Sequence, residues 1–340
     1  MENTDFSLIK ERLSSPLRIV LTTHSNPDGD AIGSCLALYQ YLYKKKHTVH
    51  VIIPDPFPEF LAWLPYQEDI LIFKQHQKQC ISLISNANVI FSIDYNNLNR
   101  LNEAEPYISG SEAFKVLFDH HLYPAQQFDL MISTPETSST AELVYDYIIS
   151  SGDQQLLDRH IAECIYAGIV TDTGSFSYSC NYVKTYQVIA ELYRLGINGE
   201  HIHRMIYDTY SENRLRLLGH SISEKLIVLP GFHTAYITLD KSELQRFEYR
   251  VGDTEGVVNF ALSIKDINLA ALFMERDGIV KVSFRSKGNF SVDQFAREHF
   301  NGGGHTNASG ANCETSLKET VQKFLSLLPE YSAKLDKVYE

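Results

Sequence analysis

Two short segments carry the side chains of this sequence that are best suited to metal chemistry. The first runs from His24 to Asp30 (HSNPDGD) and the second is Asp119-His120-His121; each follows an apolar run. A parallel sheet brings residues beyond the carboxyl ends of its strands to one edge. If the two segments meet there, their carboxylates and imidazoles can bind divalent cations, and the expected chemistry is metal-dependent hydrolysis of phosphate esters.

Two more aspartates extend this pattern. Asp94 follows the predicted strand 88–93, and Asp172 follows a predicted helix that can return to the same edge. With Asp28 and Asp30 they make four carboxylates, which would repel one another in one pocket unless two divalent cations balanced their charge. Mixed carboxylate and imidazole ligands without thiolate favour Mn²⁺ and, less specifically, Mg²⁺, Co²⁺ or Zn²⁺. Two such ions can activate a water for in-line attack on phosphorus.

Each of these motifs alone has an ordinary structural explanation. A segment of Asn, Pro, Asp and Gly is usually a turn, a His-His pair is usually a polar loop, and an Asp after a strand often caps a helix. Their joint occurrence at strand ends favours the metal site. Thr137 to Thr140 before Glu142 predicts a helix-capping box, with substrate contact as the alternative.

A second cluster could bind phosphate. Asn301-Gly302-Gly303-Gly304-His305 holds three glycines whose N–H groups could approach an anion, and His305 could add a charged hydrogen bond. The predicted strand 282–286 carries Arg285, whose guanidinium suits phosphate oxygens. A glycine run alone is more often a flexible loop, but these residues together favour phosphate recognition.

Strands that alternate with helices predict an α/β fold with a mostly parallel sheet covered by helices on both faces. The expected strands are 18–23, 47–53, 88–93, 114–118 and 128–132, and the main helices are 31–44, 139–149 and 158–170. Residues 182–223 are expected to be nearly all helix. A smaller α+β domain follows, with strand 232–239, a hairpin of 267–274 and 279–284 turning at Asp277-Gly278, and helices 291–299 and 317–328. We therefore expect a first domain over 1–195, a helical linker over 196–223 and a second domain over 224–340, with the active site in the cleft between the domains.

Size and charge restrict the partners. The chain has 340 residues and a formal charge of −12, which disfavours binding of long duplex nucleic acid. A small anionic substrate remains compatible, because bound metals can invert the local field. The five cysteines are scattered without a CxxC motif, no secretory segment begins the sequence, and no stretch has the length of a membrane span. These features predict a cytoplasmic protein with reduced thiols and no membrane partner.

The order of these motifs resembles that of the DHH/DHHA1 phosphoesterase family. The resemblance covers nearly the whole chain, and in size and layout it is greatest to the NrnA type within that family. It implies a dinuclear site, usually of manganese. The motifs His24-x-x-x-Asp28-x-Asp30, Asp94, Asp119-His120-His121, Asp172 and Gly302-Gly303-Gly304-His305 carry it.

The resemblance also implies roles for individual residues. One metal ion would be held by His24, Asp28 and Asp94, and the other by Asp30, Asp94, His120 and Asp172, with Asp94 bridging the two. Asp119 would orient ligands, and His121 would face the substrate and help the leaving oxygen depart. The substrate's terminal phosphate would be bound by Arg285, Gly303, Gly304 and His305.

The expected function is hydrolysis of phosphate esters in short RNA fragments and in 3′-phosphoadenosine 5′-phosphate (PAP), by a homodimer if the family habit holds. Hydrolysis of pApA or cyclic dinucleotides is the nearest alternative, because the same site could serve. Pyrophosphatase or exopolyphosphatase activity fits the glycine motif less well, and a processive exonuclease would need a further nucleic-acid-binding domain. A non-catalytic nucleotide sensor is the alternative of a different class, but it would be expected to have lost ligands.

Overall fold

The computed structural model describes residues 6–178 and 180–339. The chain divides into two compact units, Met1–Thr209 and Tyr210–Glu340, and each is described by itself. No helix among the described residues is long and apolar enough to span a membrane. The division falls inside the segment 196–223, where α8 (Gly199–Tyr207) packs on the first unit and α9 (Glu212–Ser223) on the second.

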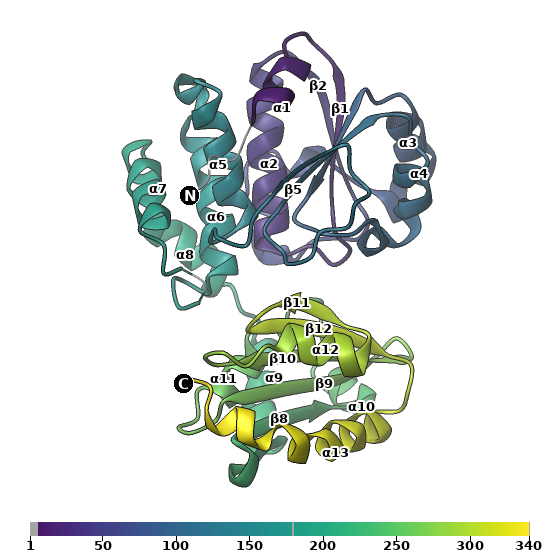
Figure 1. Cartoon of the computed structure of the whole chain (residues 1–340), viewed down its shortest axis with the longest axis vertical. Coiled ribbons are helices and arrows are strands. Elements are labelled where there is room, and N and C mark those ends of the chain that lie inside the picture. The colour runs from purple at the N-terminus through teal and green to yellow at the C-terminus, as the bar shows by residue number, and fades with distance from the viewer. Residues whose placement is uncertain (1–5, 179, 340) are drawn as a thin grey trace. The chain divides into compact units, whose positions relative to one another are not determined.

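The first unit contains a six-stranded sheet in which every pairing is parallel (Figure 1). The strand order is β3-β2-β1-β4-β5-β6. The strands are β1 (Arg18–Thr23), β2 (Thr48–Ile53), β3 (Ile70–Ile72), β4 (Val89–Ile93), β5 (Phe114–Asp119) and β6 (Leu130–Ser133). This confirms the five predicted strands and adds β3. Because β1, β4 and β5 are neighbours, the segments after residues 23, 93 and 119 emerge side by side.

Helices cover both faces of this sheet, as predicted. Alternate residues of β1 point to opposite sides, so that Leu21 joins the core under α2, α5 and α6, whereas Val20 joins the core under α3 and α4. Figure 1 shows these two groups of helices on either side of the strands. The helices of this unit are α1 (Ser7–Arg12), α2 (Gly29–Lys44), α3 (Phe73–Ser85), α4 (Glu105–Ser109), α5 (Thr140–Ser150), α6 (Arg159–Asp172), α7 (Val183–Arg194) and α8, with a short 3₁₀ segment, η3 (Leu98–Ala104), after β4.

The second unit is the smaller α+β unit that the sequence predicts. Its sheet has the order β11-β12-β10-β9-β8-β7, and all pairings are antiparallel except β8 with β9. The Asp277-Gly278 turn of the predicted hairpin has positive φ at both residues, as a tight hairpin turn requires. The strands are β7 (Leu226–Leu229), β8 (Thr234–Leu239), β9 (Leu269–Arg276), β10 (Ile279–Ser286), β11 (Gly303–His305) and β12 (Ala308–Cys313).

The two faces of this second sheet differ. On β10, Val282 and Phe284 are fully buried in a core with α12 and α13, whereas Ser283 and Arg285 point to the other face and are partly exposed. The segment 301–305, for which a flexible loop is the ordinary explanation of the glycine run, contains strand β11. The helices are α9, α10 (Lys241–Arg246), α11 (Val257–Leu262), α12 (Val292–Phe300) and α13 (Leu317–Asp336).

Candidate metal centre

Asp94 lies at the centre of the candidate site. It follows β4 with a left-handed backbone (φ 64°), a conformation that few residues other than glycine adopt without strain. Its N–H donates to the Phe118 carbonyl at 2.8 Å, which fixes the turn between two neighbouring strands. The side chain is almost fully buried, and its two oxygens face different groups of polar side chains.

The two carboxylate oxygens of Asp94 lie between two potential ligand groups. Oδ2 is 3.6 Å from His24 Nε2, which is in turn 4.0 Å from Asp28 Oδ2. Oδ1 is 3.6 Å from His120 Nε2. That nitrogen also lies 3.7 Å from Asp30 Oδ2 and 3.5 Å from the nearest Asp172 oxygen. The structure thus brings together all six residues that the sequence predicts as metal ligands.

Hydrogen bonds to neighbouring backbone groups orient these side chains toward Asp94. His24 Nδ1 donates to the Ser25 carbonyl at 2.9 Å, which leaves the lone pair of Nε2 directed at Asp94. Asp28 caps helix α2 by accepting from the Ala31 N–H through Oδ1, while Oδ2 faces His24. Asp28 can therefore cap the helix with one oxygen and still offer the other to a metal ion.

Helix α5 holds two of the aspartates by its N-terminus. Asp30 accepts from the backbone N–H groups of Thr140 and Ala141 at 2.7 and 2.9 Å, and the Thr140 hydroxyl donates to Asp94 Oδ1 at 2.8 Å. The capping residue is Ser139, which accepts from the Glu142 N–H, whereas the Glu142 carboxylate bonds Ser138. The predicted helix start is confirmed, but the capping box is only half formed, because the Glu142 carboxylate accepts from Ser138 and not from the N–H of the capping Ser139. No sequence signal marks the Thr140 contact, although a helix N-terminus is a known anion site.

Helices α2 and α6 approach closely behind Asp30. Gly168 of α6 faces this contact, and a Cβ at that position would lie 2.9 Å from Asp30 Oδ1 and 2.6 Å from the Ala141 Cβ. Glycine at position 168 therefore leaves room for the buried carboxylate and for the helix that binds it.

The donor set fits divalent cations. Burial, followed by the charges of nearby aspartates, raises the pKa of both Asp30 and Asp94 well above the usual value. Burial and the Arg100 guanidinium lower the pKa of His24 to about 4, which keeps the imidazole neutral and able to ligate. Cations among these groups would favour the ionised carboxylates. Burial also raises the pKa of the Cys35 thiol, so that oxygen and imidazole nitrogen remain the available donors.

Asp119 and His121 form a pair at the rim of the same cluster. His121 Nδ1 is 2.7 Å from Asp119 Oδ1 and 3.8 Å from Asp94 Oδ1. On its other side, His121 Nε2 is 3.2 Å from Nη1 of Arg100, a residue of η3. No motif or spacing marks Arg100; only the folded chain brings it to His121.

In the second unit, Arg285 and His305 lie in one cross-strand row. Arg285 of β10 pairs with Ala308 of β12, and Ala308 pairs with His305 of β11. Directly opposed residues in a sheet point to the same face, so Arg285 and His305 flank the small Ala308 on one surface. In the next row on this face Gly303 pairs with Gly310, which pairs with Ser283, so that row adds only the small hydroxyl side chain of Ser283 beside Arg285 and His305.

The glycines of segment 301–305 mainly allow the backbone to pair and to form hydrogen bonds within the second unit. The Gly302 N–H donates to the Ala296 carbonyl at 3.0 Å, and the Gly304 N–H donates to the buried Asp293 carboxylate at 2.7 Å. A Cβ at position 304 would lie 2.5 Å from the Ala308 carbonyl oxygen. The expected cradle of glycine N–H groups is therefore not available from positions 302 and 304, and their small size lets β11 pair with β12.

Comparison with known families agrees with this architecture. Residues 18–169 match the DHH family, N-terminal domain, and residues 232–334 match the DHHA1 domain. The chain belongs to the DHH family. This confirms the predicted family of phosphoesterases, and the six potential metal ligands lie within the DHH domain or, for Asp172, three residues beyond its matched end.

Several proteins match most of this chain. It is 29% identical to the bifunctional oligoribonuclease and PAP phosphatase NrnA of Bacillus subtilis, over 86% of this chain and 88% of that protein. It is also 29% identical to the protein of the same name from Thermus thermophilus, over 92% and 89% of the two chains. A solved structure of an exopolyphosphatase-related protein from Bacteroides fragilis is 41% identical, with a TM-score of 0.92 and 97% coverage of each chain.

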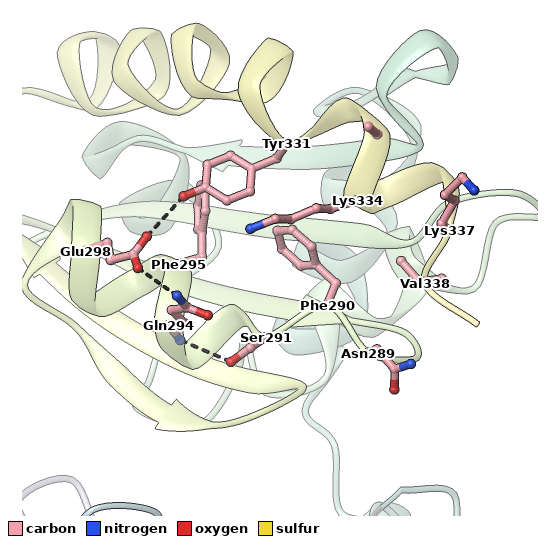
Figure 2. Close-up of a pocket in the computed structure, with 11 residues that line it drawn as sticks. Asn289, Phe290, Ser291, Gln294, Phe295, Glu298, Tyr331, Lys334, Lys337 and Val338 are labelled. Atoms are coloured by element: carbon pink, nitrogen blue, oxygen red, sulfur yellow. Dashed lines mark hydrogen bonds between the residues drawn. The ribbon is translucent and has the colours of Figure 1, made fainter. Parts of the chain in front are cut away.

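The DHHA1 domain also contains a cavity of about 470 Å³ between α12 and α13 (Figure 2). Arg285 and His305 do not line it. Glu298 accepts hydrogen bonds there from Tyr331 and Gln294, and Lys334 lies beside the Tyr331 ring. The polar groups of this cavity thus bond mainly to one another, and the cavity lies between two helices that pack on the Phe284 face of the sheet.

Proposed function

We propose that this protein hydrolyses phosphate esters in short oligoribonucleotides and in PAP, using two divalent cations bound in the DHH domain. The observation that carries the proposal is the placement of Asp94, which directs one oxygen toward each of two ligand groups. The names of the NrnA relatives support the substrate class. Cytoplasmic location and a homodimeric state belong to the same proposal.

The residues present suit a dinuclear site. His24, Asp28 and Asp94 would hold one cation, and the second would be held by Asp30, Asp94, His120 and Asp172. Mn²⁺ is our choice for both, with Mg²⁺ or Co²⁺ as alternatives, because hard oxygen and imidazole donors predominate. Two such cations polarise phosphoryl oxygens and lower the pKa of water, so that water becomes a nucleophile near neutral pH.

Side chains of the protein would orient the metal ligands and bind the substrate. Thr140 and the N-terminus of α5 keep Asp94 and Asp30 oriented before substrate arrives, which reduces the reorganisation needed during reaction. Asp119 holds the ring of His121 toward the substrate side. In the DHHA1 domain, Arg285 and His305 would bind a terminal phosphate with charged hydrogen bonds. Gly303 and Gly304 would leave room for it.

A substrate panel tests the proposal. Purified protein with Mn²⁺ should release product from RNA of roughly two to five nucleotides and from PAP. Longer RNA should be a poorer substrate, because binding it needs a broader basic surface. The panel includes pApA, cyclic di-AMP and pyrophosphate, and it includes polyphosphate because of the name of the Bacteroides relative. If only polyphosphate is turned over, the assignment of nucleotide substrates is wrong. If no phosphate ester is hydrolysed, the proposed function is wrong.

Replacing Arg285 by alanine should raise KM for substrates with a terminal phosphate. We expect an increase of about 10- to 100-fold, because a hydrogen bond to a charged group contributes roughly 1.5–3 kcal/mol. Bis(p-nitrophenyl) phosphate lacks a terminal phosphate, so its KM should not change. The matched control is Arg216→Ala, which removes an exposed arginine from α9. An unchanged KM for PAP in Arg285→Ala would remove this residue from the binding set.

A further inference from the structure

We propose that Arg100 is a further catalytic residue, whose guanidinium contacts the phosphoryl group under attack in the DHH domain. The inference rests on the proposed function, since it assigns a role within the same site. It arises from the contact between Arg100 and His121, from the way in which the Arg100 backbone is fixed, and from the charge balance around it.

The backbone of Arg100 is anchored beside the metal-ligand cluster. Its carbonyl accepts from the Ser25 N–H at 2.8 Å, and its N–H donates to the Asn97 carbonyl at 3.1 Å. Ser25 follows directly after His24, so this bond ties η3 to the first metal-ligand segment. Arg100 therefore reaches the site from a fixed main chain, although it lies in a short 3₁₀ segment.

The contact with His121 is one that a phosphate oxygen could replace. An arginine side chain only donates hydrogen bonds, so in the contact of 3.2 Å the nitrogen that accepts is His121 Nε2. The ring proton is then on Nδ1, where it is donated to Asp119 at 2.7 Å. A neutral imidazole is a weaker acceptor for guanidinium than an anionic phosphate oxygen. A phosphoryl group near His121 would thus compete successfully for the Arg100 donors.

Within the described part of the chain, no direct partner neutralises the charge of Arg100. Among the described residues no carboxylate forms an ion pair with it, and its side-chain hydrogen bond is to the His121 ring. Its side chain is partly buried, so its field acts through less water than that of an exposed arginine. A cation placed in this way can stabilise the negative charge that develops on the phosphoryl oxygens.

The experiment compares Arg100→Ala and Arg100→Lys with wild type in the 340-residue chain. Arg100→Ala should lower kcat for bis(p-nitrophenyl) phosphate by about 10²- to 10³-fold, the usual effect of removing one transition-state donor. Arg100→Lys should recover part of the loss because it keeps the charge. Calorimetric titration should show Mn²⁺ binding unchanged and the affinity of the Mn²⁺-loaded protein for inorganic phosphate reduced. Arg204→Ala, which removes an exposed arginine from α8, is the matched control.

A role confined to holding His121 makes a different prediction. In that case Arg100→Ala would weaken phosphate binding only when His121 is present, and it would have no effect in a His121→Ala background. Direct contact requires a loss of phosphate affinity in both backgrounds, and unchanged phosphate affinity and kcat in Arg100→Ala would overturn the proposal. Phosphate binding can be measured even if wild type cleaves no ester, so failure of the proposed function is distinguishable from failure of this inference.

Discussion

Replacement of Asp94 by asparagine should abolish turnover, with kcat/KM reduced by at least about 10³-fold, the order expected when the chief electrostatic groups of an active site are lost. Asparagine retains one oxygen, but its amide nitrogen cannot ligate a cation, so the shared ligand between the two groups is lost. Asparagine tolerates the left-handed backbone at this position. The effect can therefore be assigned to the lost carboxylate rather than to backbone strain.

The measurement pairs kinetics with metal binding. Hydrolysis of bis(p-nitrophenyl) phosphate reports turnover, and calorimetric titration reports how many Mn²⁺ ions bind and how tightly. The matched control is Asp208→Asn, which removes an exposed carboxylate at the end of α8. Wild-type turnover with full metal binding in Asp94→Asn would refute the bridging role.

A second large effect is expected from Gly168→Ala, a substitution that adds one methyl group outside the cluster. The new Cβ would lie 2.9 Å from Asp30 Oδ1 and 2.6 Å from the Ala141 Cβ, so either the carboxylate or helix α5 must shift. Overpacking of this kind costs about 1–3 kcal/mol of folding stability. Because the same shift displaces Asp30 from the α5 N–H groups, Mn²⁺ affinity should fall together with the Tm.

Gly219→Ala provides the comparison for this substitution. Gly219 is also a glycine inside a helix, but a Cβ there would meet no atom within 4 Å. Alanine at that position should leave metal binding unchanged and raise stability by up to about 1 kcal/mol through helix propensity. If Gly168→Ala behaves like Gly219→Ala in both Tm and Mn²⁺ titration, the close approach behind Asp30 is not required by the site.

Much of the fold and the cluster could be predicted because both depend on local sequence signals. Apolar runs ending in Thr23, Ile93 and Asp119 mark neighbouring parallel strands, and parallel strands necessarily bring their carboxyl ends to one edge. The Asp277-Gly278 turn likewise follows from residues that accept positive φ. The polar residues after these strands could be assigned to one site without knowledge of any contact.

Other features depend on contacts between distant segments. Strand β11 consists of Gly303, Gly304 and His305, which have no strand propensity, and it forms because β12 offers backbone partners. Strand β3 is only three residues long, too short for a periodic signal. Thr140 and Arg100 contact the cluster across 46 and 21 residues of sequence respectively, through Asp94 and His121. No spacing rule connects such pairs.

The row that contains Arg285, Ala308 and His305 has a consequence for substrate choice. Between these two side chains lies only the methyl group of Ala308, and the next row on this face holds Ser283 and the glycines 310 and 303. The groups nearest to a phosphate bound at Arg285 and His305 are therefore small, and Ser283 is the nearest of them that could also hydrogen-bond a nucleobase. We expect such a surface to discriminate little between nucleotides that differ only in their base, and Ser283 is the position at which a base preference could arise.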